Sequence, residues 1–163
     1  MRCILRRREL EADAAAEAVI LALAELRADR NRWRGYRGPL GVRLAPGDAV
    51  EELTDLLPYL AVVAVEFPNA SEGRGYSQAR LLRERLGFVG ELRAVGAAVR
   101  QDQLFLMARC GFDAFELAPG EDFDSARRAL ARYDVAYQPG SALVEVRQRF
   151  IERSRVTAAD PKS

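Results

Sequence analysis

The stretch "VAVEFPNASEGRGYSQARLLRERLGFVGELRAVG", residues 63–96, decides the fold class. It begins with an apolar run that carries one glutamate and ends at a proline, and a polar loop with two glycines follows. An amphipathic segment of helical length comes next, and a second apolar run with one arginine closes the stretch. Short apolar runs bounded by turn residues are typical of buried parallel strands. The stretch therefore predicts a β-strand, a crossover helix and a second, parallel β-strand.

The same design recurs along the chain. Five apolar runs carry one polar residue near their carboxyl end and close with proline or glycine: "GVRLAP" from Gly41, "VAVEFP" from Val63, "ELRAVG" from Glu91, "AFELAP" from Ala114 and "VAYQPG" from Val135. Amphipathic segments between them predict helices at about 48–57, 77–86, 100–110 and 124–133. The first opens with Asp48 and Glu51, which fit a capping box. The fold class is therefore α/β, with repeated βα units and a parallel sheet.

Two of the expected helices end alike, in "RLGF" at residues 85–88 and "RCGF" at residues 109–112. A glycine just past a helix readily adopts the left-handed backbone conformation that ends it, and the next residue can fold back onto the last turn. We therefore expect Gly87 and Gly111 to end helices, with Phe88 and Phe112 packed beneath them.

The two ends of the chain differ from this repeat. Residues 1–35 predict a short strand at 3–5 and one long alanine-rich helix at about 13–32, packed on the core. Residues 36–140 form the expected βα-repeat domain. Residues 141–163 combine a weaker helical pattern with a polar end that we expect to be disordered.

The single polar residue of each run gives a hypothesis about strand order. These residues are Arg43, Glu66, Arg93, Glu116 and Gln138. If they share one row across the sheet, sequential strand order makes every charged neighbour opposite in sign, whereas the flavodoxin-like order 2-1-3-4-5 puts two arginines side by side. We therefore expect a partial TIM-barrel-like sheet, or a small closed one completed by the N-terminal strand. A flavodoxin-like open sheet is the alternative.

The row itself has two interpretations. It can be a salt-bridge lattice that fixes strand register, or it can be the floor of a ligand site. Glu66 and Glu116 could also act as an acid and base pair, but neighbouring arginines hold carboxylates ionised, which suits structure better than proton transfer. Because a partial barrel leaves sheet edges exposed, we also expect a homo-oligomer.

Composition excludes several classes of function. The 163 residues carry a formal net charge of +1 with no dense basic block, so we expect no nucleic acid and no membrane as partners. The chain has no histidine, which rules out Ser-His-Asp and Cys-His nucleophiles and His-based zinc sites. Cys3 and Cys110 are its two cysteines, too few for a cysteine-held metal cluster and consistent with the cytoplasm. We therefore predict no metal site.

The longest predicted loop after a strand offers a candidate contact surface. Sites of parallel βα proteins lie at the carboxyl ends of the strands, and the glycines and arginines of residues 66–80 fall there. The candidates for anion binding or partner docking are Arg74, Gly75, Tyr76, Ser77, Arg80, Arg100 and Gln103. The loop lacks both the dinucleotide fingerprint and the lysine of a phosphate-binding Walker loop. An anion site, a docking loop and a loop that needs glycine only to turn all remain open.

Three motifs resemble a known bacterial family, domain of unknown function 934: "GRGYSQARLLRERLGFVGELRAVG", "RQDQLFLMARCGFDAFEL" and "VAYQ". The resemblance spans about residues 27–138, and the chain after Gln138 is longer than the family pattern. It implies a role in the bacterial cytoplasm beside assimilatory sulfite reductase, under the family's label of probable oxidoreductases of sulfite reduction. It supplies no catalytic residues.

Three functions follow as expectations. The first is an accessory protein that docks on sulfite reductase, or on another sulfur-assimilation protein, without a redox cofactor of its own, because the sequence lacks the usual cofactor ligands. The second is an enzyme, an oxidoreductase of sulfite reduction, that binds sulfite, sulfate, a phosphate or a flavin phosphate. The third is a purely structural oligomer.

Overall fold

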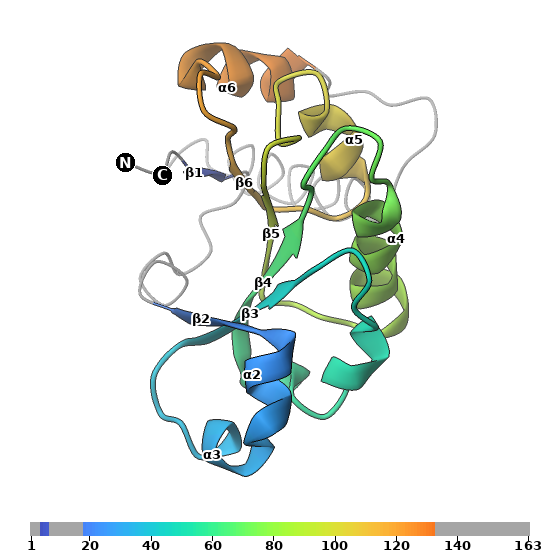
Figure 1. Ribbon diagram of the computed structural model, residues 1–163. Helices are drawn as coiled ribbons and strands as arrows, with labels where there is room; N and C mark the ends of the chain where they lie inside the picture. The colour runs from blue at the N-terminus through green and yellow to red at the C-terminus, as the bar shows by residue number, and fades with distance from the viewer. Residues whose placement is uncertain (1–3, 7–17, 133–163) are drawn as a thin grey trace, which may run out of the picture.

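The computed structural model of the protein describes residues 4–6 and 18–132. Its strands are β1 Ile4–Arg6, β2 Val19–Ala22, β3 Leu40–Leu44, β4 Leu60–Glu66, β5 Glu91–Val95 and β6 Ala114–Glu116. Its helices are α2 Leu23–Ala28, α3 Arg30–Arg34, α4 Arg74–Arg80, α5 Leu104–Arg109 and α6 Phe123–Arg132. Two short 3-10 turns, Val50–Leu53 and Leu57–Tyr59, connect β3 to β4, and a π-helical turn, Leu81–Arg85, extends α4. Strand and helix alternate as the sequence predicts (Figure 1).

The strands form one open sheet in the order β1-β6-β5-β4-β3-β2. Strands β2 to β6 run parallel in sequential order, and β1 pairs antiparallel with the outer edge of β6. The α/β class and the sequential order of a partial barrel are therefore confirmed. The flavodoxin-like order is wrong for this sheet, and so is a closed barrel, because β1 pairs only with β6 and leaves the sheet open.

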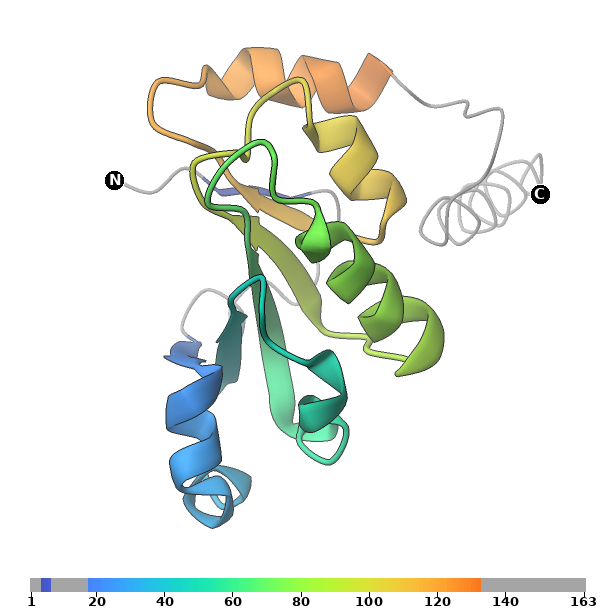
Figure 2. The same ribbon diagram turned by 45° about the vertical axis from the view of Figure 1, so that its right-hand side comes forward.

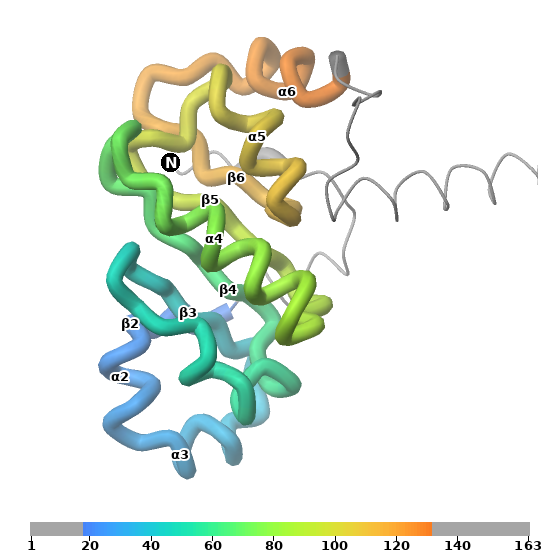
Figure 3. The backbone as a smooth tube through the Cα atoms, turned by 90° about the vertical axis from the view of Figure 1, so that its right-hand side faces the viewer, coloured from blue at the N-terminus to red at the C-terminus, as the bar shows by residue number. Residues whose placement is uncertain are grey.

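One face of the sheet carries the hydrophobic core. Figure 3 views the sheet from the side on which α4 and α5 lie. Alternate residues of the central strands point to this face and are fully buried against the helices: Val42, Leu44, Val63, Val65, Leu92, Ala94 and Phe115 from the sheet, with Leu82, Leu104 and Met107 from the crossovers. The period-two alternation of the strands and the apolar stripe of each helix meet at this layer.

The glycines that end the crossovers adopt the predicted conformation. Gly87 has φ of 66° and Gly111 has φ of 108°. The amide of Phe88 donates to the carbonyl of Leu82 at 2.8 Å, which closes the last turn, and both phenylalanines are buried. The prediction from "RLGF" and "RCGF" is confirmed.

In its described part, the single helix predicted for residues 13–32 is correct for two helical segments, Leu23–Ala28 and Arg30–Arg34, and wrong for residues 19–22 and for the break at Asp29. Residues 19–22 form β2, which pairs in parallel with β3, and two short helices follow. Val19 and Ile20 are β-branched, and the edge of β3 offers them backbone hydrogen bonds that an isolated helix would not use. Alanine content alone therefore overstated the helix.

The first crossover also differs from its prediction. The capping box of Asp48 and Glu51 is wrong, because the Asp48 carboxylate accepts from the amide of Ala45 at 2.8 Å and closes a turn ahead of the helical segment. In place of one helix the chain makes two 3-10 turns, and Pro58 lies at the start of the second, where a proline is tolerated. The predicted apolar face survives, since Val50, Leu53 and Leu57 are buried. The strand predicted from Val135, with Gln138, and the helix and tail predicted for residues 141–163 lie outside the described residues.

Candidate functional site

The loops that follow β4, β5 and β6 are held together by backbone hydrogen bonds beyond the strand ends. The amide of Phe67 donates to the carbonyl of Val95 at 2.7 Å, and the amide of Ala98 donates to the carbonyl of Phe67 at 3.1 Å. The amide of Ala118 donates to the carbonyl of Val99 at 2.9 Å. These bonds make the carboxyl edge of the sheet a fixed platform, on which the candidate residues stand.

Glycine serves packing at this edge. A Cβ on Gly75 would lie 2.6 Å from the ring of Phe67, so the glycine lets α4 approach that ring. A Cβ on Gly96, whose φ is 114°, would lie 2.4 Å from the carbonyl oxygen of Phe67. Gly73 has φ of −96°, and a Cβ added to it would meet no atom within 4 Å, so neither sterics nor dihedral requires glycine there. Gly75 and Gly96 thus both fit around Phe67.

Each arginine proposed for an anion already contacts a carboxylate. Arg74 contacts Glu72 at 3.1 Å, Arg100 contacts Glu121 at 3.2 Å, and Arg80 contacts Glu84 at 3.5 Å. These contacts lie at separate places, and the arginine side chains are 69%, 64% and 56% exposed. An incoming anion would compete with a carboxylate at every one of them.

The structure does bring Tyr76 and Gln103 together. The Tyr76 hydroxyl donates to Oε1 of Gln103 at 3.0 Å, and its ring packs against Phe67 with centroids 5.0 Å apart. Burial raises the pKa of the Tyr76 phenol, and the nearby Cys110 and Asp102 raise it further. The phenol therefore stays protonated and acts as a donor that joins α4 to the start of α5. Ser77 lies exposed on α4.

Cys110 lies at the end of α5, close to the Tyr76 phenol. It is buried, and burial raises the pKa of its thiol, while Arg80 and Arg109 lower it in part. A thiol held in its neutral form is a poor nucleophile. Cys110 is therefore a packing residue.

Gln78 is a polar residue that sequence reasoning missed. It is 5% exposed, and its Nε2 donates to the carbonyls of Ala45 and Asp48, each at 2.9 Å. It thereby ties α4 to the loop after β3. The signal was present in the sequence, because Gln78 falls on the buried stripe of α4 next to Ala79 and one turn from Leu82.

The polar row on the second face of the sheet is two rows. Neighbouring strands pair Ala22 with Arg43, Arg43 with Ala64, Ala64 with Arg93, and Arg93 with Ala114. Alanine and arginine thus alternate across the five parallel strands. Each arginine has a small residue on both sides, which leaves room for its side chain to lie over the sheet.

The glutamates form the next row toward the carboxyl edge. Glu66 and Glu116 lie two residues beyond Ala64 and Ala114, on the same face. Side chains supplied to a layer by alternate strands are the arrangement of a TIM-barrel interior. The prediction of a single row is therefore corrected, while the shared face and the barrel-like pattern stand.

The ion pairs on this face differ in burial. Arg43 contacts Glu66 at 2.7 Å, with side chains 46% and 30% exposed. Arg93 donates from Nε to Glu91 at 2.7 Å, and these side chains are 6% and 1% exposed. Glu91, two residues before Arg93 on the same strand, was not among the predicted row residues. Gln138 lies outside the described residues.

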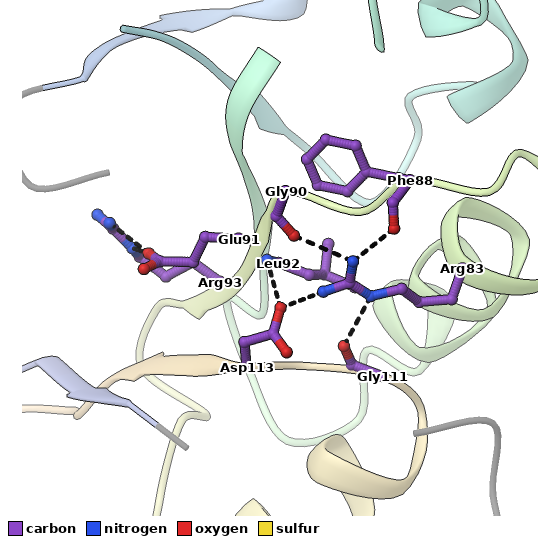
Figure 4. A network of polar contacts seen from close by, with 8 residues as sticks. All are labelled: Arg83, Phe88, Gly90, Glu91, Leu92, Arg93, Gly111 and Asp113. Atoms are coloured by element: carbon purple, nitrogen blue, oxygen red, sulfur yellow. Dashed lines mark hydrogen bonds and ion pairs between the residues drawn. The ribbon is translucent and has the colours of Figure 1, made fainter. Parts of the chain in front are cut away.

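A second buried network lies at the amino ends of β5 and β6 (Figure 4). Arg83 donates to the carbonyls of Phe88, Gly90 and Gly111 and to the carboxylate of Asp113. The Asp113 carboxylate also accepts from the amide of Leu92 at 3.1 Å. The guanidinium therefore joins the end of the α4 crossover to two strands, at the edge opposite the candidate loops.

Two kinds of feature are absent from the described part of the chain, a cluster of metal ligands and a membrane-spanning helix. Among the described residues, no group of three or more His, Cys, Asp or Glu side chains is placed to hold a metal ion. Within the same residues, no helix combines the length and the apolar character needed to cross a bilayer.

Comparison with known proteins gives one match. The profile of a family described as "Bacterial protein of unknown function (DUF934)" matches residues 41–146. No significant match was found among curated proteins or among solved structures. The matched range begins within β3 and contains β4 to β6 and the loops of the candidate site.

Proposed function

The chain belongs to the bacterial family of unknown function called domain of unknown function 934, and from this premise we propose that it is an accessory protein of sulfite reduction. In this proposal it works in the bacterial cytoplasm and docks on sulfite reductase, or on another protein of sulfur assimilation, without a redox cofactor of its own. The motifs that resemble the family imply the setting, and the loops at the carboxyl edge of the sheet supply the contact surface.

One observation supports docking over the binding of a small anion. The arginines of these loops are exposed and each already contacts a carboxylate, as Arg74 does with Glu72 and Arg100 with Glu121. Exposed arginines that are held by less exposed carboxylates suit the polar rim of a protein interface, where charges set orientation and association rate. A sulfite or phosphate pocket would instead need arginines that point to one place and are not already paired with carboxylates.

The fixed platform under these arginines supports the same proposal. Tyr76 is held by Gln103 and Phe67, and the loops are joined by backbone hydrogen bonds. A surface that is ordered before binding loses less conformational entropy on association. Interface backbones of preorganised complexes move little, so the loops can be tested as they stand.

The test is a binding titration between the purified chain and the sulfite reductase of the same bacterium, followed by calorimetry. We expect a complex, and we expect Arg74→Gln with Arg100→Gln to weaken it about five-fold, because rim charge pairs contribute on the order of 0.5 kcal/mol each. The matched control is Arg27→Gln with Arg34→Gln on α2 and α3, which removes the same charge, also paired with carboxylates, from helices at the end of the molecule away from these loops (Figure 2). No complex, together with no change in sulfite-dependent electron consumption by the reductase, would refute the proposal.

The competing function is an anion- or phosphate-binding oxidoreductase. Two measurements on the same preparation distinguish it from the accessory protein. A bound flavin would give a visible absorbance spectrum. Sulfite, sulfate, phosphate or flavin mononucleotide at millimolar concentration should stabilise a specific binder by on the order of 1 kcal/mol. A chromophore or such a stabilisation would favour the enzyme and count against the accessory role.

A further inference from the structure

Five exposed side chains lie in the connections that lead into the amino ends of the neighbouring strands β3, β4 and β5. Tyr36 and Arg37 precede β3, Tyr59 directly precedes β4, and Arg85 and Val89 precede β5. We call these five residues the amino-end patch. In Figure 2 the connections into these strands lie on the lower side of the sheet, away from the loops at its upper side. The patch is therefore a different surface from the candidate loops.

The three apolar or aromatic side chains of the patch have large exposed fractions. Tyr36 is 41% exposed, Tyr59 is 52% exposed and Val89 is 84% exposed. Val89 sits between Phe88, which is buried, and Gly90, so its exposure is local to one side chain. Single exposed apolar residues are ordinary, but three at one edge of adjacent strands form a patch that water solvates poorly.

The two arginines of the patch carry unbalanced charge. Most other exposed arginines contact carboxylates, as Arg27 does with Glu52 and Arg34 with Asp55, although Arg32 and Arg128 do not. Within residues 18–132, neither Arg37 nor Arg85 contacts an acidic side chain. The patch therefore combines apolar surface with two positive charges that no carboxylate of the described residues pairs, and that a carboxylate of a partner could pair.

We propose that the amino-end patch is a docking surface for a second protein that presents carboxylates around an apolar spot. Tyrosine and arginine are the residue types that carry binding energy at protein interfaces, and both are present here. Two arginines are too few for the phosphate contacts that nucleic acid binding uses, or for the basic cluster that an anionic membrane requires. The patch goes beyond the proposed function, because it faces away from the loops and leaves them free for another contact.

The test titrates isotope-labelled full-length chain with a synthetic peptide in which pairs of glutamates flank phenylalanine and leucine, and follows the amide resonances. We expect shifts at the amino-end patch, and weaker binding as salt is raised. The matched peptide carries glutamine in place of every glutamate and should bind at least about five-fold more weakly, because it cannot pair the two arginines.

Variants assign the binding to the patch. Arg37→Gln with Arg85→Gln should weaken binding of the acidic peptide about five- to ten-fold, and Val89→Ser should weaken it through the apolar contact. Arg127→Gln with Arg128→Gln removes the same charge from α6 and should leave the affinity unchanged. All of these side chains are exposed, and unchanged thermal unfolding will show that each variant folds.

Several results would overturn the proposal. They are equal binding of the two peptides, resonance shifts away from the patch, or no binding at millimolar peptide. Preferential binding of duplex DNA or of phosphatidylserine vesicles through the patch would also refute a protein partner. So would self-association through the patch, seen in sedimentation and abolished by Val89→Ser.

Discussion

Arg83 and Asp113 form an ion pair that closes the amino ends of β5 and β6 over the end of the α4 crossover. Their side chains are 11% and 5% exposed. Arg83 also donates to backbone carbonyls, and Asp113 also accepts a hydrogen bond from the amide of Leu92. A buried pair satisfied in this way is costly to break from one side. The ion pair between Arg83 and Asp113 should therefore contribute strongly to the stability of the fold.

Removing the arginine alone should be severe. Arg83→Met leaves the Asp113 carboxylate buried without its cation and three carbonyls without their donor, so we expect a loss of about 3–5 kcal/mol in the free energy of unfolding. Urea denaturation measures it. Asp113→Asn in the same background should recover part of the loss, because the amide is neutral and still accepts from Leu92. As a control, Arg80→Gln, whose exposed pair with Glu84 contributes little, should cost under about 1 kcal/mol.

The two arginines of the alanine–arginine row should behave differently. Arg93→Met removes the guanidinium that pairs with the Glu91 carboxylate, which is 1% exposed, and should destabilise by about 3 kcal/mol or more. Arg43→Met breaks a pair with Glu66 that is nearly half exposed to solvent, and should cost about 0–1 kcal/mol. Chemical unfolding of the two variants side by side decides it. Equal losses would contradict the difference in burial.

The glycines around Phe67 allow a test of packing. Gly96→Ala forces a side chain into a left-handed conformation and against the carbonyl of Phe67, so we expect a loss of about 2–4 kcal/mol. Gly73→Ala meets neither obstacle and should leave stability within about 1 kcal/mol of the wild type. Thermal and urea unfolding report both. A Gly96→Ala variant as stable as Gly73→Ala would mean that the loop after β5 can rearrange freely.

Cys110 gives a prediction about pH. Because burial raises the pKa of its thiol, the folded protein keeps the thiol neutral at a pH where the unfolded chain, with a thiol pKa of about 8.5, has begun to ionise. The contribution of Cys110 to the free energy of unfolding is complete below the thiol pKa of the unfolded chain. It is lost as pH rises from that value through the higher pKa of the folded protein. In a Cys3→Ser background, Cys110 should therefore react slowly with iodoacetamide at neutral pH. Cys110→Ala should flatten the alkaline loss of stability.

The sequence predicted much of the fold because β4 and β5 are buried along nearly their whole length and the crossover helices on one face. The apolar runs and the two Gly-Phe endings located β3 to β6 and two crossovers. The alternating signs of Arg43, Glu66 and Arg93 favoured the correct sequential strand order, although Glu66 lies in the next row and not beside the two arginines. Residues 19–22 were missed because the pairing of an edge strand depends on β3, which lies far along the chain, and no local pattern encodes it.

The candidate site was predictable in place and less so in detail. The loops after β4 and β5 do meet, and Tyr76 and Gln103 contact each other across them. The pairing of Arg100 with Glu121 could not be read from spacing, because the two residues lie far apart in the chain. Gly75 illustrates the same limit, because its role depends on the position of the Phe67 ring.

The alternation of alanine and arginine on the second face also sets a spacing between like charges. Arg43 and Arg93 are two strands apart, which is about 10 Å between backbones, whereas adjacent strands would bring them to about 5 Å. Coulomb repulsion halves with that doubling of distance, and it does so at any dielectric constant. Ala64 therefore acts as a spacer of charge, and a larger or basic residue there would crowd two cations that the sheet otherwise keeps apart.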